Sequence, residues 1–207
     1  MRTQHTLPCT GPLRASVILL HGYAADAAVH RADGVAFVGE GTEVVMPDAP
    51  GHGGRGDGRL AAIASLDDER RRAAILDLAR QWAAELPDLA LHCRQRGAQR
   101  VGVVGISMGG FAALASLAQP CPFDAVAAVL AAPELVDPRT VAPGHPPLLL
   151  GLAGKDRAVP PEPGRRFARD YGAELHEYAE SEHFMRGEDW LDLWGRVRAF
   201  LLRHLGG

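Results

Sequence analysis

The sequence is poor in cysteine and has no long apolar run, and each shortage excludes a class of protein. Its three cysteines, Cys9, Cys93 and Cys121, are an odd number without C-x-x-C spacing, which argues against a disulfide framework and against a zinc site. Only about six consecutive apolar residues precede His21, too few for the core of a secretion signal or for a membrane span. We therefore expect a cytoplasmic protein in a reducing compartment.

Positive charge is not in excess either. Lys and Arg number 22 against 25 Asp and Glu, so the formal net charge is −3. This balance gives no electrostatic reason to expect a nucleic acid or a membrane surface as a partner, and it suits a small-molecule ligand better. The length of 207 residues and the 47% content of hydrophobic residues fit a single domain over residues 1–207.

Apolar runs of strand type alternate with helical segments along the chain. Strands are expected at residues 17–20, 43–46, 101–106, 125–132, 148–153 and 174–178. Helices are expected near residues 29–38, 67–85, 86–96, 108–118, 162–171 and 188–205. Short strands that are apolar throughout and separated by helices indicate an α/β fold, with three α/β/α layers around a mainly parallel sheet of about six or seven strands.

One serine lies between two glycines in the stretch Gly105-Ile106-Ser107-Met108-Gly109, directly after an apolar strand and directly before an apolar helix. A sharp bend from strand to helix needs small neighbours, so that the two elements approach closely, and it exposes the side chain at its apex. The pentapeptide alone is a common pattern, but its position between strand and helix is the context that such a bend requires. The pattern predicts a nucleophilic Ser107 above the carboxyl edge of the sheet.

A serine hydroxyl reacts well only when a base removes its proton and a carboxylate orients that base. His183 follows the last expected strand and is the favoured base, and Asp156 follows the strand before it and is the favoured acid. The order Ser107, Asp156, His183 is the one that this architecture uses. Glu134 and Asp137 are alternatives for the acid, and a purely structural role of Asp156 as a helix cap stays open.

The remaining histidines are weaker candidates for the base. His21 ends the first clear strand, where its ring is expected to shape the loop, and His52 lies in a glycine-rich loop. Three lie inside expected helices or strands, where surface or packing roles are expected, and these are His92, His176 and His204. Three more have no supporting context and are His5, His30 and His145.

The tetrahedral intermediate of acyl transfer carries a negative oxygen that needs two N–H donors. The backbone amide of Met108 offers one of them. The loop LLHGYAAD offers the other, because Gly22 lets the chain turn so that the Tyr23 amide points toward the serine. The alternative is that Gly22 belongs to an ordinary turn.

Taken together, these pieces resemble the α/β-hydrolase superfamily, and more closely the small bacterial carboxylesterases of the dienelactone-hydrolase-like group. The resemblance implies a catalytic triad of Ser107, Asp156 and His183 and an oxyanion hole formed by the amides of Tyr23 and Met108. The acyl-enzyme mechanism needs no cofactor, and the sequence has no H-E-x-x-H metal motif. The resemblance covers nearly the whole chain in five segments, LLHGYAAD at 19–26, VVMPDAPGHGGR at 44–55, GISMGG at 105–110, LAGKDRAVP at 152–160 and SEHFM at 181–185.

Two departures from that family's pattern shape the expected site. Fewer than fifteen residues precede the strand at Ala15, so we expect the sheet to lack one or two strands. Only residues 136–147 stand where many members carry a helical lid, so we expect an open and shallow site. Such a site favours short acyl esters as small-molecule substrates, and Tyr23 and Phe184 are candidates to line it. Thioesters and acyl peptides stay open as alternatives, because they pass through the same acyl-enzyme.

A second class of function is raised by Gly51, Gly53 and Gly56, which match the G-x-G-x-x-G pattern of dinucleotide-binding folds. This pattern would indicate a nicotinamide-dependent oxidoreductase. It is weakened by Pro47 and Pro50, because the glycines must join strand and helix directly, and no helical pattern follows at once.

Overall fold

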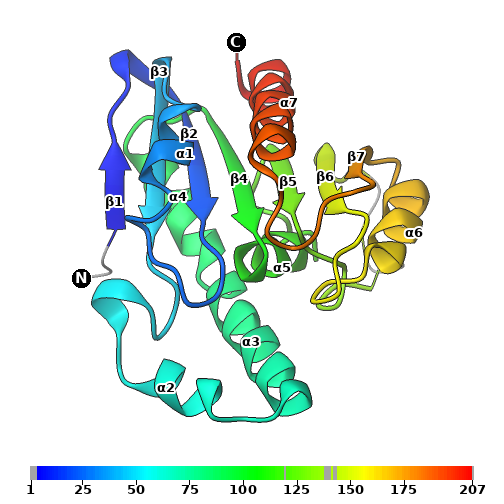
Figure 1. Cartoon of the computed structure of the whole chain (residues 1–207). Coiled ribbons are helices and arrows are strands. Elements are labelled where there is room, and N and C mark those ends of the chain that lie inside the picture. Colours follow the sequence, from blue (N-terminus) through cyan, green and yellow to red (C-terminus); the bar gives the residue numbers. More distant parts are fainter. Residues whose placement is uncertain (1–3, 119, 138–140, 142–143, 207) are drawn as a thin grey trace.

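The computed structural model describes residues 4–118, 120–137, 141 and 144–206 of the chain. Figure 1 shows a twisted sheet at its centre, with helices on both faces. In the described residues the sheet has seven strands, in the spatial order β1-β3-β2-β4-β5-β6-β7. They are β1 (Gln4–Leu7), β2 (Thr10–Leu20), β3 (Glu40–Pro47), β4 (Arg100–Ile106), β5 (Ala125–Val129), β6 (Leu148–Ala153) and β7 (Glu174–Tyr178). Strands β2 to β7 are parallel, so the expected α/β fold is confirmed.

The described helices are α1 (Arg31–Val35), α2 (Arg59–Ala64), α3 (Asp68–Ala83), α4 (Leu86–Gln95), α5 (Met108–Ala115), α6 (Pro161–Tyr171) and α7 (Gly187–Leu205), with a short 3₁₀ turn η1 (Gly53–Arg55). Helix α3 begins where the sequence predicts, because the Asp67 carboxylate caps it and accepts a hydrogen bond of 2.9 Å from the Arg70 amide. None of the described helices is long and apolar enough to cross a membrane.

The helices form one layer on each face of the sheet. Helices α1 and α7 lie on one face, and α3, α4, α5 and α6 lie on the other (Figure 1). Successive residues of β2 serve both faces, since Val17 and Leu19 belong to the core under α7, whereas Ile18 and Leu20 belong to the core under α5. A parallel strand that is buried on both faces must be apolar throughout, which explains the continuous apolar runs in the sequence.

Two short elements are missing from the sequence prediction. Strand β1 is a four-residue edge strand that pairs antiparallel with β3, and of its residues only Leu7 is buried. Helix α2 has six residues and follows the glycine-rich stretch. Neither is long enough to show a clear strand or helix period. Of the segment 136–147, which was expected in place of a lid, residues 138–140 and 142–143 lie outside the described residues.

The strand order reverses beside β2. From β2 the chain moves outward to β3 and then crosses back to β4 on the other side of β2. The chain after β2 and the chain after β4 therefore turn to opposite faces of the sheet and leave a crevice between them, where open α/β sheets bind ligands. Ser107 lies at this point, because it follows β4 directly.

Candidate active site

The turn from β4 to α5 is a tight bend with Ser107 at its apex. Ser107 has φ 52° and ψ −113°, a conformation that costs a residue other than glycine about 1–3 kcal/mol. A Cβ atom at Gly105 would lie 2.1 Å from the Gly109 carbonyl oxygen, and a Cβ at Gly109 would lie 2.5 Å from the Leu20 carbonyl oxygen. Both glycines are therefore needed so that strand and helix can approach each other and expose the serine.

Three polar side chains from three different loops meet at this edge of the sheet. Ser107 Oγ lies 3.0 Å from His183 Nε2, and His183 Nδ1 lies 2.7 Å from Asp156 Oδ2. A carboxylate only accepts hydrogen bonds, so Nδ1 carries the proton and Nε2 is free to accept from the serine hydroxyl. The Asp156 side chain is 1% exposed and the His183 side chain 22% exposed. The structure thus brings together the three residues that the sequence singled out.

The loops after β6 and β7 are fastened to each other, and this brings Asp156 and His183 into contact. The Lys155 amide donates a hydrogen bond of 2.8 Å to the Ser181 carbonyl oxygen. The Ser181 hydroxyl is buried and donates at 2.5 Å to the Asp189 carboxylate at the start of α7. The histidine two residues after Ser181 therefore stands on a loop that is held at both ends.

Asp156 has a structural set of contacts as well. Its Oδ1 accepts hydrogen bonds of 2.9 Å from the Ala158 amide and 2.8 Å from the Val159 amide, which fix the turn before α6. The structural role that the sequence left open and the contact with His183 thus coexist, one on each carboxylate oxygen. Glu134, an alternative acid in the sequence analysis, forms an ion pair with an arginine of α3.

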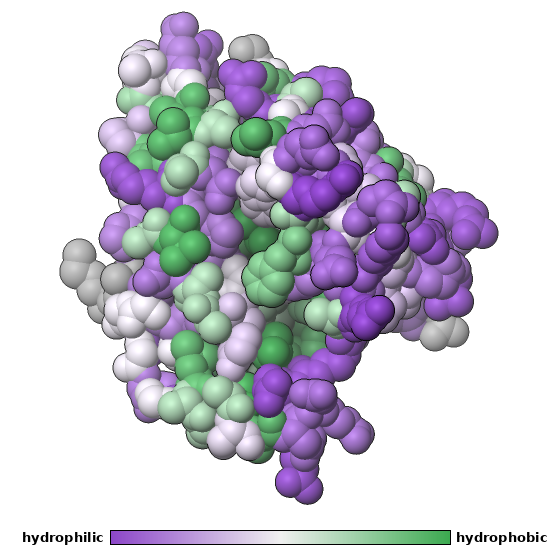
Figure 2. Space-filling view, viewed as in Figure 1, coloured by the Kyte–Doolittle hydropathy of each residue, from purple (hydrophilic) through white to green (hydrophobic). Residues whose placement is uncertain are grey.

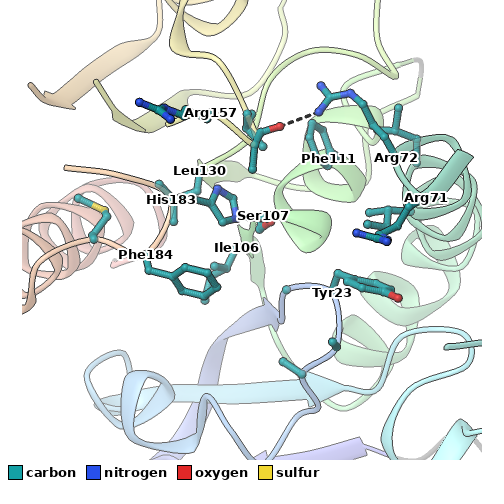
Figure 3. A pocket seen from close by; sticks show the side chains of 18 of the residues that line it. Tyr23, Arg71, Arg72, Ile106, Ser107, Phe111, Leu130, Arg157, His183 and Phe184 are labelled. Carbon is teal, nitrogen blue, oxygen red and sulfur yellow. Dashed lines mark hydrogen bonds between the residues drawn. The ribbon is translucent and has the colours of Figure 1, made fainter. Parts of the chain in front are cut away.

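The loop after β2 packs against the serine turn. A Cβ atom at Gly22 would lie 3.6 Å from Ser107 Cβ, and Tyr23 follows directly and lines the cavity beside the serine (Figure 3). Met108 is the first residue of α5, where backbone N–H groups have no partner within the helix. The two amides expected to form an oxyanion hole, those of Tyr23 and Met108, therefore belong to segments that adjoin Ser107.

A cavity of about 1170 Å³ opens beside Ser107. A shallow site is expected from the sequence. This cavity is instead larger than most ligand sites, which usually occupy about 300–1,000 Å³. Figure 2 shows green, apolar surface around a hollow below the centre of this face, with purple, hydrophilic surface to its right. In Figure 3, Tyr23, Phe111 and Arg71 lie on one side of Ser107 and Phe184 on the other. Tyr23 and Phe184, the two sequence candidates, both line the cavity.

One wall of the cavity is formed by α3, which the sequence analysis did not assign to the site. The Arg72 guanidinium reaches across to the opposite wall and donates a hydrogen bond of 2.6 Å to the Ala158 carbonyl oxygen (Figure 3). In the sequence, α3 has the pattern of an ordinary surface helix, and only its packing on α5 places it over the site. Its residues that line the cavity are Asp68, Glu69, Arg71, Arg72, Ile75 and Leu76.

The buried His21 ties the end of β2 to the loop after β3. Its Nδ1 donates at 2.8 Å to the Gly22 carbonyl oxygen, and its Nε2 accepts at 3.0 Å from the Ala49 amide. Burial lowers the pKa of His21 to about 4, because the charged ring would lose its hydration. His21 is therefore neutral at pH 7, and both ring nitrogens serve the backbone.

The glycine-rich segment after β3 lacks the geometry of a dinucleotide-binding turn. It leads into the 3₁₀ turn η1 and not into the N-terminus of a helix that could receive a pyrophosphate. Gly51 and Gly53 have φ values of 79° and 49°, and Gly53 lies so close to Asp48 that a Cβ would meet the carboxylate at 2.5 Å. Within the part of the chain that the structure describes, no group of three or more His, Cys, Asp or Glu residues could hold a metal ion.

Comparison with known proteins places this geometry in a family. The family model described as "Alpha/beta hydrolase family" matches residues 17–205. The chain belongs to the alpha/beta hydrolase family. The resemblance drawn from the sequence motifs is thereby confirmed. A comparison with curated proteins found no significant match.

Solved structures share this alpha/beta hydrolase fold along almost their whole length. Esterase PE8 is 26% identical, with a TM-score of 0.72, and the match covers 97% of this chain and 99% of that one. TT1662 from Thermus thermophilus is 20% identical, with a TM-score of 0.74 and coverage of 100% and 94%. Acyl-protein thioesterase 2 from Zea mays is 17% identical, with a TM-score of 0.68 and coverage of 97% and 100%.

Proposed function

We propose that this alpha/beta hydrolase is a serine carboxylesterase-type enzyme that cleaves carboxylic esters through an acyl-enzyme intermediate. The observation that carries the proposal is the hydrogen-bonded path from Ser107 Oγ through His183 to Asp156, at the wall of a cavity. The similarity to esterase PE8 supports the same class of reaction. Ser107 is the nucleophile, His183 the general base and acid, and Asp156 the group that orients the imidazole and stabilises its charged form.

Acylation begins when Ser107 Oγ attacks the carbonyl carbon of the ester and His183 Nε2 takes the hydroxyl proton. The carbonyl electron pair moves onto the oxygen and gives a tetrahedral intermediate. When that pair returns, the bond to the leaving oxygen breaks. The leaving oxygen takes the proton from His183 and departs as an alcohol, so the acyl group stays on Ser107.

Deacylation repeats these steps with water. His183 takes a proton from the water molecule while its oxygen attacks the acyl carbon. Collapse of the second tetrahedral intermediate breaks the bond to Ser107 Oγ, which recovers its proton from His183. The products are the free carboxylic acid and the original enzyme, and the cycle consumes no other reactant.

The negative oxygen of both intermediates rests against the backbone amides of Tyr23 and Met108. The Met108 amide lies at the N-terminus of α5, where the helix dipole favours negative charge. Removal of one such donor in a comparable site costs about 10²–10³ in turnover, so these amides supply a large part of the rate.

The cavity has room for an ester whose acyl group is more than small. The cavity of about 1170 Å³ and its apolar residues Tyr23, Phe111 and Phe184 suit an apolar substrate of moderate size. Because the leaving oxygen must take its proton from His183 Nε2, the alcohol part lies on the His183 side of the cavity, where Figure 3 also shows Phe184.

Labelling with a fluorophosphonate tests the proposal directly. An activated serine displaces fluoride and forms a stable bond to phosphorus, so peptide mapping is expected to find the label on Ser107 alone. The Ser107→Ala protein serves as the control and should take up no label. Labelling elsewhere, or none in a folded protein, would contradict the assignment.

A panel of chromogenic esters and thioesters, graded in acyl length, then ranks the substrates. Esters are expected to give the higher kcat/KM. A clear preference for thioesters would keep Ser107 as the nucleophile but move the enzyme to the thioesterase class.

A further inference from the structure

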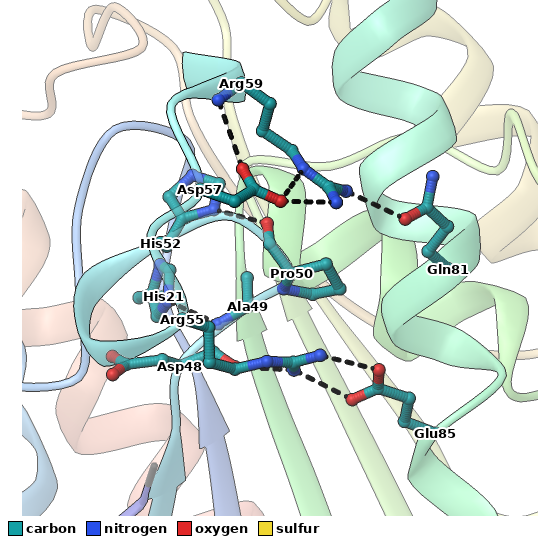
Figure 4. Close-up of polar contacts among 10 residues, drawn as sticks. All are labelled: His21, Asp48, Ala49, Pro50, His52, Arg55, Asp57, Arg59, Gln81 and Glu85. Carbon is teal, nitrogen blue, oxygen red and sulfur yellow. Dashed lines mark hydrogen bonds and ion pairs between the residues drawn. The ribbon is translucent and has the colours of Figure 1, made fainter. Parts of the chain in front are cut away.

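The loop 48–57 after β3 contains the segment PGHGGR, to which the mechanism above gives no role. Figure 4 shows residues of this loop, with His52 beside His21. His52 is fully buried, and its Nδ1 donates a hydrogen bond of 2.9 Å to the Pro50 carbonyl oxygen. Its other nitrogen, Nε2, accepts a hydrogen bond of 3.2 Å from the Ala24 amide. His52 thus connects the loop after β3 with the loop after β2, across 28 residues of chain.

The residue held by this hydrogen bond has an unusual backbone. Ala24 has φ 58°, a left-handed conformation that residues other than glycine rarely adopt. Such a conformation persists only where the surrounding structure holds it. Ala24 directly follows Tyr23, so the peptide plane that the His52 hydrogen bond fixes is the one next to the Tyr23 amide.

The ring of His52 also supports the Tyr23 ring. The two ring centroids lie 5.8 Å apart with an interplanar angle of 82°, an edge-to-face contact. Behind His52 lies His21 at 5.2 Å, and behind His21 lies the buried Trp82 of α3 at 4.9 Å. A row of four rings therefore runs from the helical core to the wall of the cavity.

The rest of the loop holds His52 in place. The Asp48 carboxylate accepts hydrogen bonds of 2.9 Å from the Ala27 amide and 2.8 Å from the Gly54 amide, so it too spans both loops. The Arg55 guanidinium donates at 3.0 Å to the Asp48 carbonyl oxygen and forms a two-point ion pair with Glu85, with contacts of 2.8 and 2.9 Å (Figure 4). Glu85 adjoins the end of α3, so the loop is anchored to the helical layer.

We propose that His52 is a positioning residue of the enzyme. It accepts a hydrogen bond from the Ala24 amide and packs on the Tyr23 ring, and both contacts keep the Tyr23 amide aimed at the developing oxyanion. The inference rests on the proposed function, because it presupposes that Tyr23 and Ser107 act on the same carbonyl group. His52 contacts neither the serine nor the base, so it acts only through the loop.

The surroundings of His52 keep its acceptor available at neutral pH. Burial lowers the pKa of His52, and the charge of Arg59 acts in the same direction. The hydrogen bond to the Pro50 carbonyl oxygen and the nearby carboxylates of Asp48 and Asp57 raise this pKa but do not outweigh burial. A neutral ring with its proton on Nδ1, where Pro50 accepts it, leaves Nε2 as the acceptor that Ala24 needs.

The test compares His52→Leu, which removes the acceptor, with His52→Gln, whose side-chain amide restores an oxygen acceptor. The exposed His92 on α4 provides the matched control His92→Leu. Each variant is assayed for kcat and KM on a chromogenic ester. The inhibition constant of a trifluoromethyl ketone, which forms a tetrahedral oxyanion on the serine, is measured alongside.

We expect His52→Leu to lower kcat by about tenfold to a hundredfold with little change in KM, since the oxyanion exists only after attack. The inhibition constant of the ketone should rise by a similar factor. His52→Gln should recover activity to within about threefold of the wild type, and His92→Leu should match the wild type. A folded His52→Leu protein with wild-type kcat overturns the inference. So does an equal loss in the Gln and Leu variants.

Amide hydrogen exchange keeps the inference testable if His52→Leu does not fold. Ala24 is exposed on the cavity wall, yet its amide should exchange slowly in the wild type and in His52→Gln, because both proteins supply an acceptor for it. A wild-type Ala24 amide that exchanges as fast as an unprotected loop overturns the inference. Fluorophosphonate labelling of wild-type Ser107 separates this outcome from a failure of the esterase proposal itself.

Discussion

Two glycine-rich turns lie at the same edge of the sheet and use glycine for different reasons. In the turn at 105–110, glycine is required because backbone leaves no space for a Cβ, that of α5 at Gly105 and that of β2 at Gly109. In the turn at 51–58, glycine is required chiefly because of the backbone angle, with φ of 79° at Gly51 and 87° at Gly58. The first turn leads straight into a buried helix, and the second folds around Asp48.

The difference teaches how one composition can serve two purposes. Close packing of strand and helix leaves the half-buried Ser107 side chain on the cavity wall, so the proposed chemistry depends on the first turn. Positive φ lets the second turn curl until His52 and Asp48 face the loop after β2, so that turn supports its neighbour. A count of glycines cannot separate these roles, but substitutions in each turn can.

The comparison is tested most severely at Ser107 itself. Ser107→Ala or His183→Ala should lower kcat on an ester by about 10⁴-fold or more, because neither leaves an activated nucleophile, and Asp156→Asn should cost somewhat less. Ester hydrolysis and thermal unfolding are measured on the same preparations, and the unfolding midpoint of Ser107→Ala should stay near that of the wild type. Near-normal hydrolysis by a folded Ser107→Ala protein would remove the first turn from the chemistry.

A matched pair of glycine substitutions separates lack of space from backbone angle. Gly109→Ala should destabilise the fold by about 3 kcal/mol or more, since the new Cβ meets backbone at 2.5 Å. Gly58→Ala meets nothing within 4 Å and should cost only the left-handed strain, about 1–2 kcal/mol. Urea unfolding measures both free energies. Equal costs would mean that the two turns use glycine for the same reason.

The stability of the fold should depend on pH through His21, whose ring packs at 5.2 Å behind His52 of the second turn. Its pKa is about 4 in the folded protein against an ordinary value of 6.5, so the unfolded chain binds a proton first as the pH falls. The stabilisation is complete above about pH 6.5 and declines toward pH 4, by about 3 kcal/mol at most, since one pKa unit corresponds to about 1.4 kcal/mol. Urea unfolding at pH 7, 5.5 and 4.5 measures the decline. His21→Gln should show a shallower pH dependence, and an unchanged slope would contradict this origin.

A side chain that belongs to neither turn gives the smallest effect. Phe184 lines the cavity, is 95% exposed and contacts the His183 ring edge-to-face at 5.8 Å. Phe184→Ala should raise KM about fivefold with kcat nearly unchanged, because it removes about 1 kcal/mol of apolar contact with the substrate. Leu191→Ala is the control, since Leu191 is 73% exposed on α7 but is not among the cavity-lining residues. A similar rise of KM in both variants would point to a general surface effect.

Much of the fold and of the site could be predicted from local patterns. The apolar runs predict the strands β3 to β7 and the helical patterns predict the long helices α3 and α7. The glycines and the flanking elements predict the serine turn. The order of Ser107, Asp156 and His183 followed from loops that come directly after strands. In a parallel sheet these loops must meet at one edge, so position along the chain already implies proximity in space.

What remained out of reach depends on contacts between distant segments. Strand β1 exists because β3 offers it an edge, and its own four residues carry almost no pattern. The wall formed by α3 follows from the packing of that helix on α5, and it explains why the cavity is larger than the sequence suggested.

The sequence by itself determined the alternation of strands and helices, the tight turn at Ser107 and the candidates for acid and base, because each depends on neighbours within a few residues. Only the tertiary structure decided that His52 accepts a hydrogen bond from the Ala24 amide and that α3 closes one side of the cavity. It also decided that Asp156 forms hydrogen bonds to the turn before α6 and to His183 at once. The physical reason is that hydrogen bonds and packing join groups by distance and direction, which the chain acquires only when it folds.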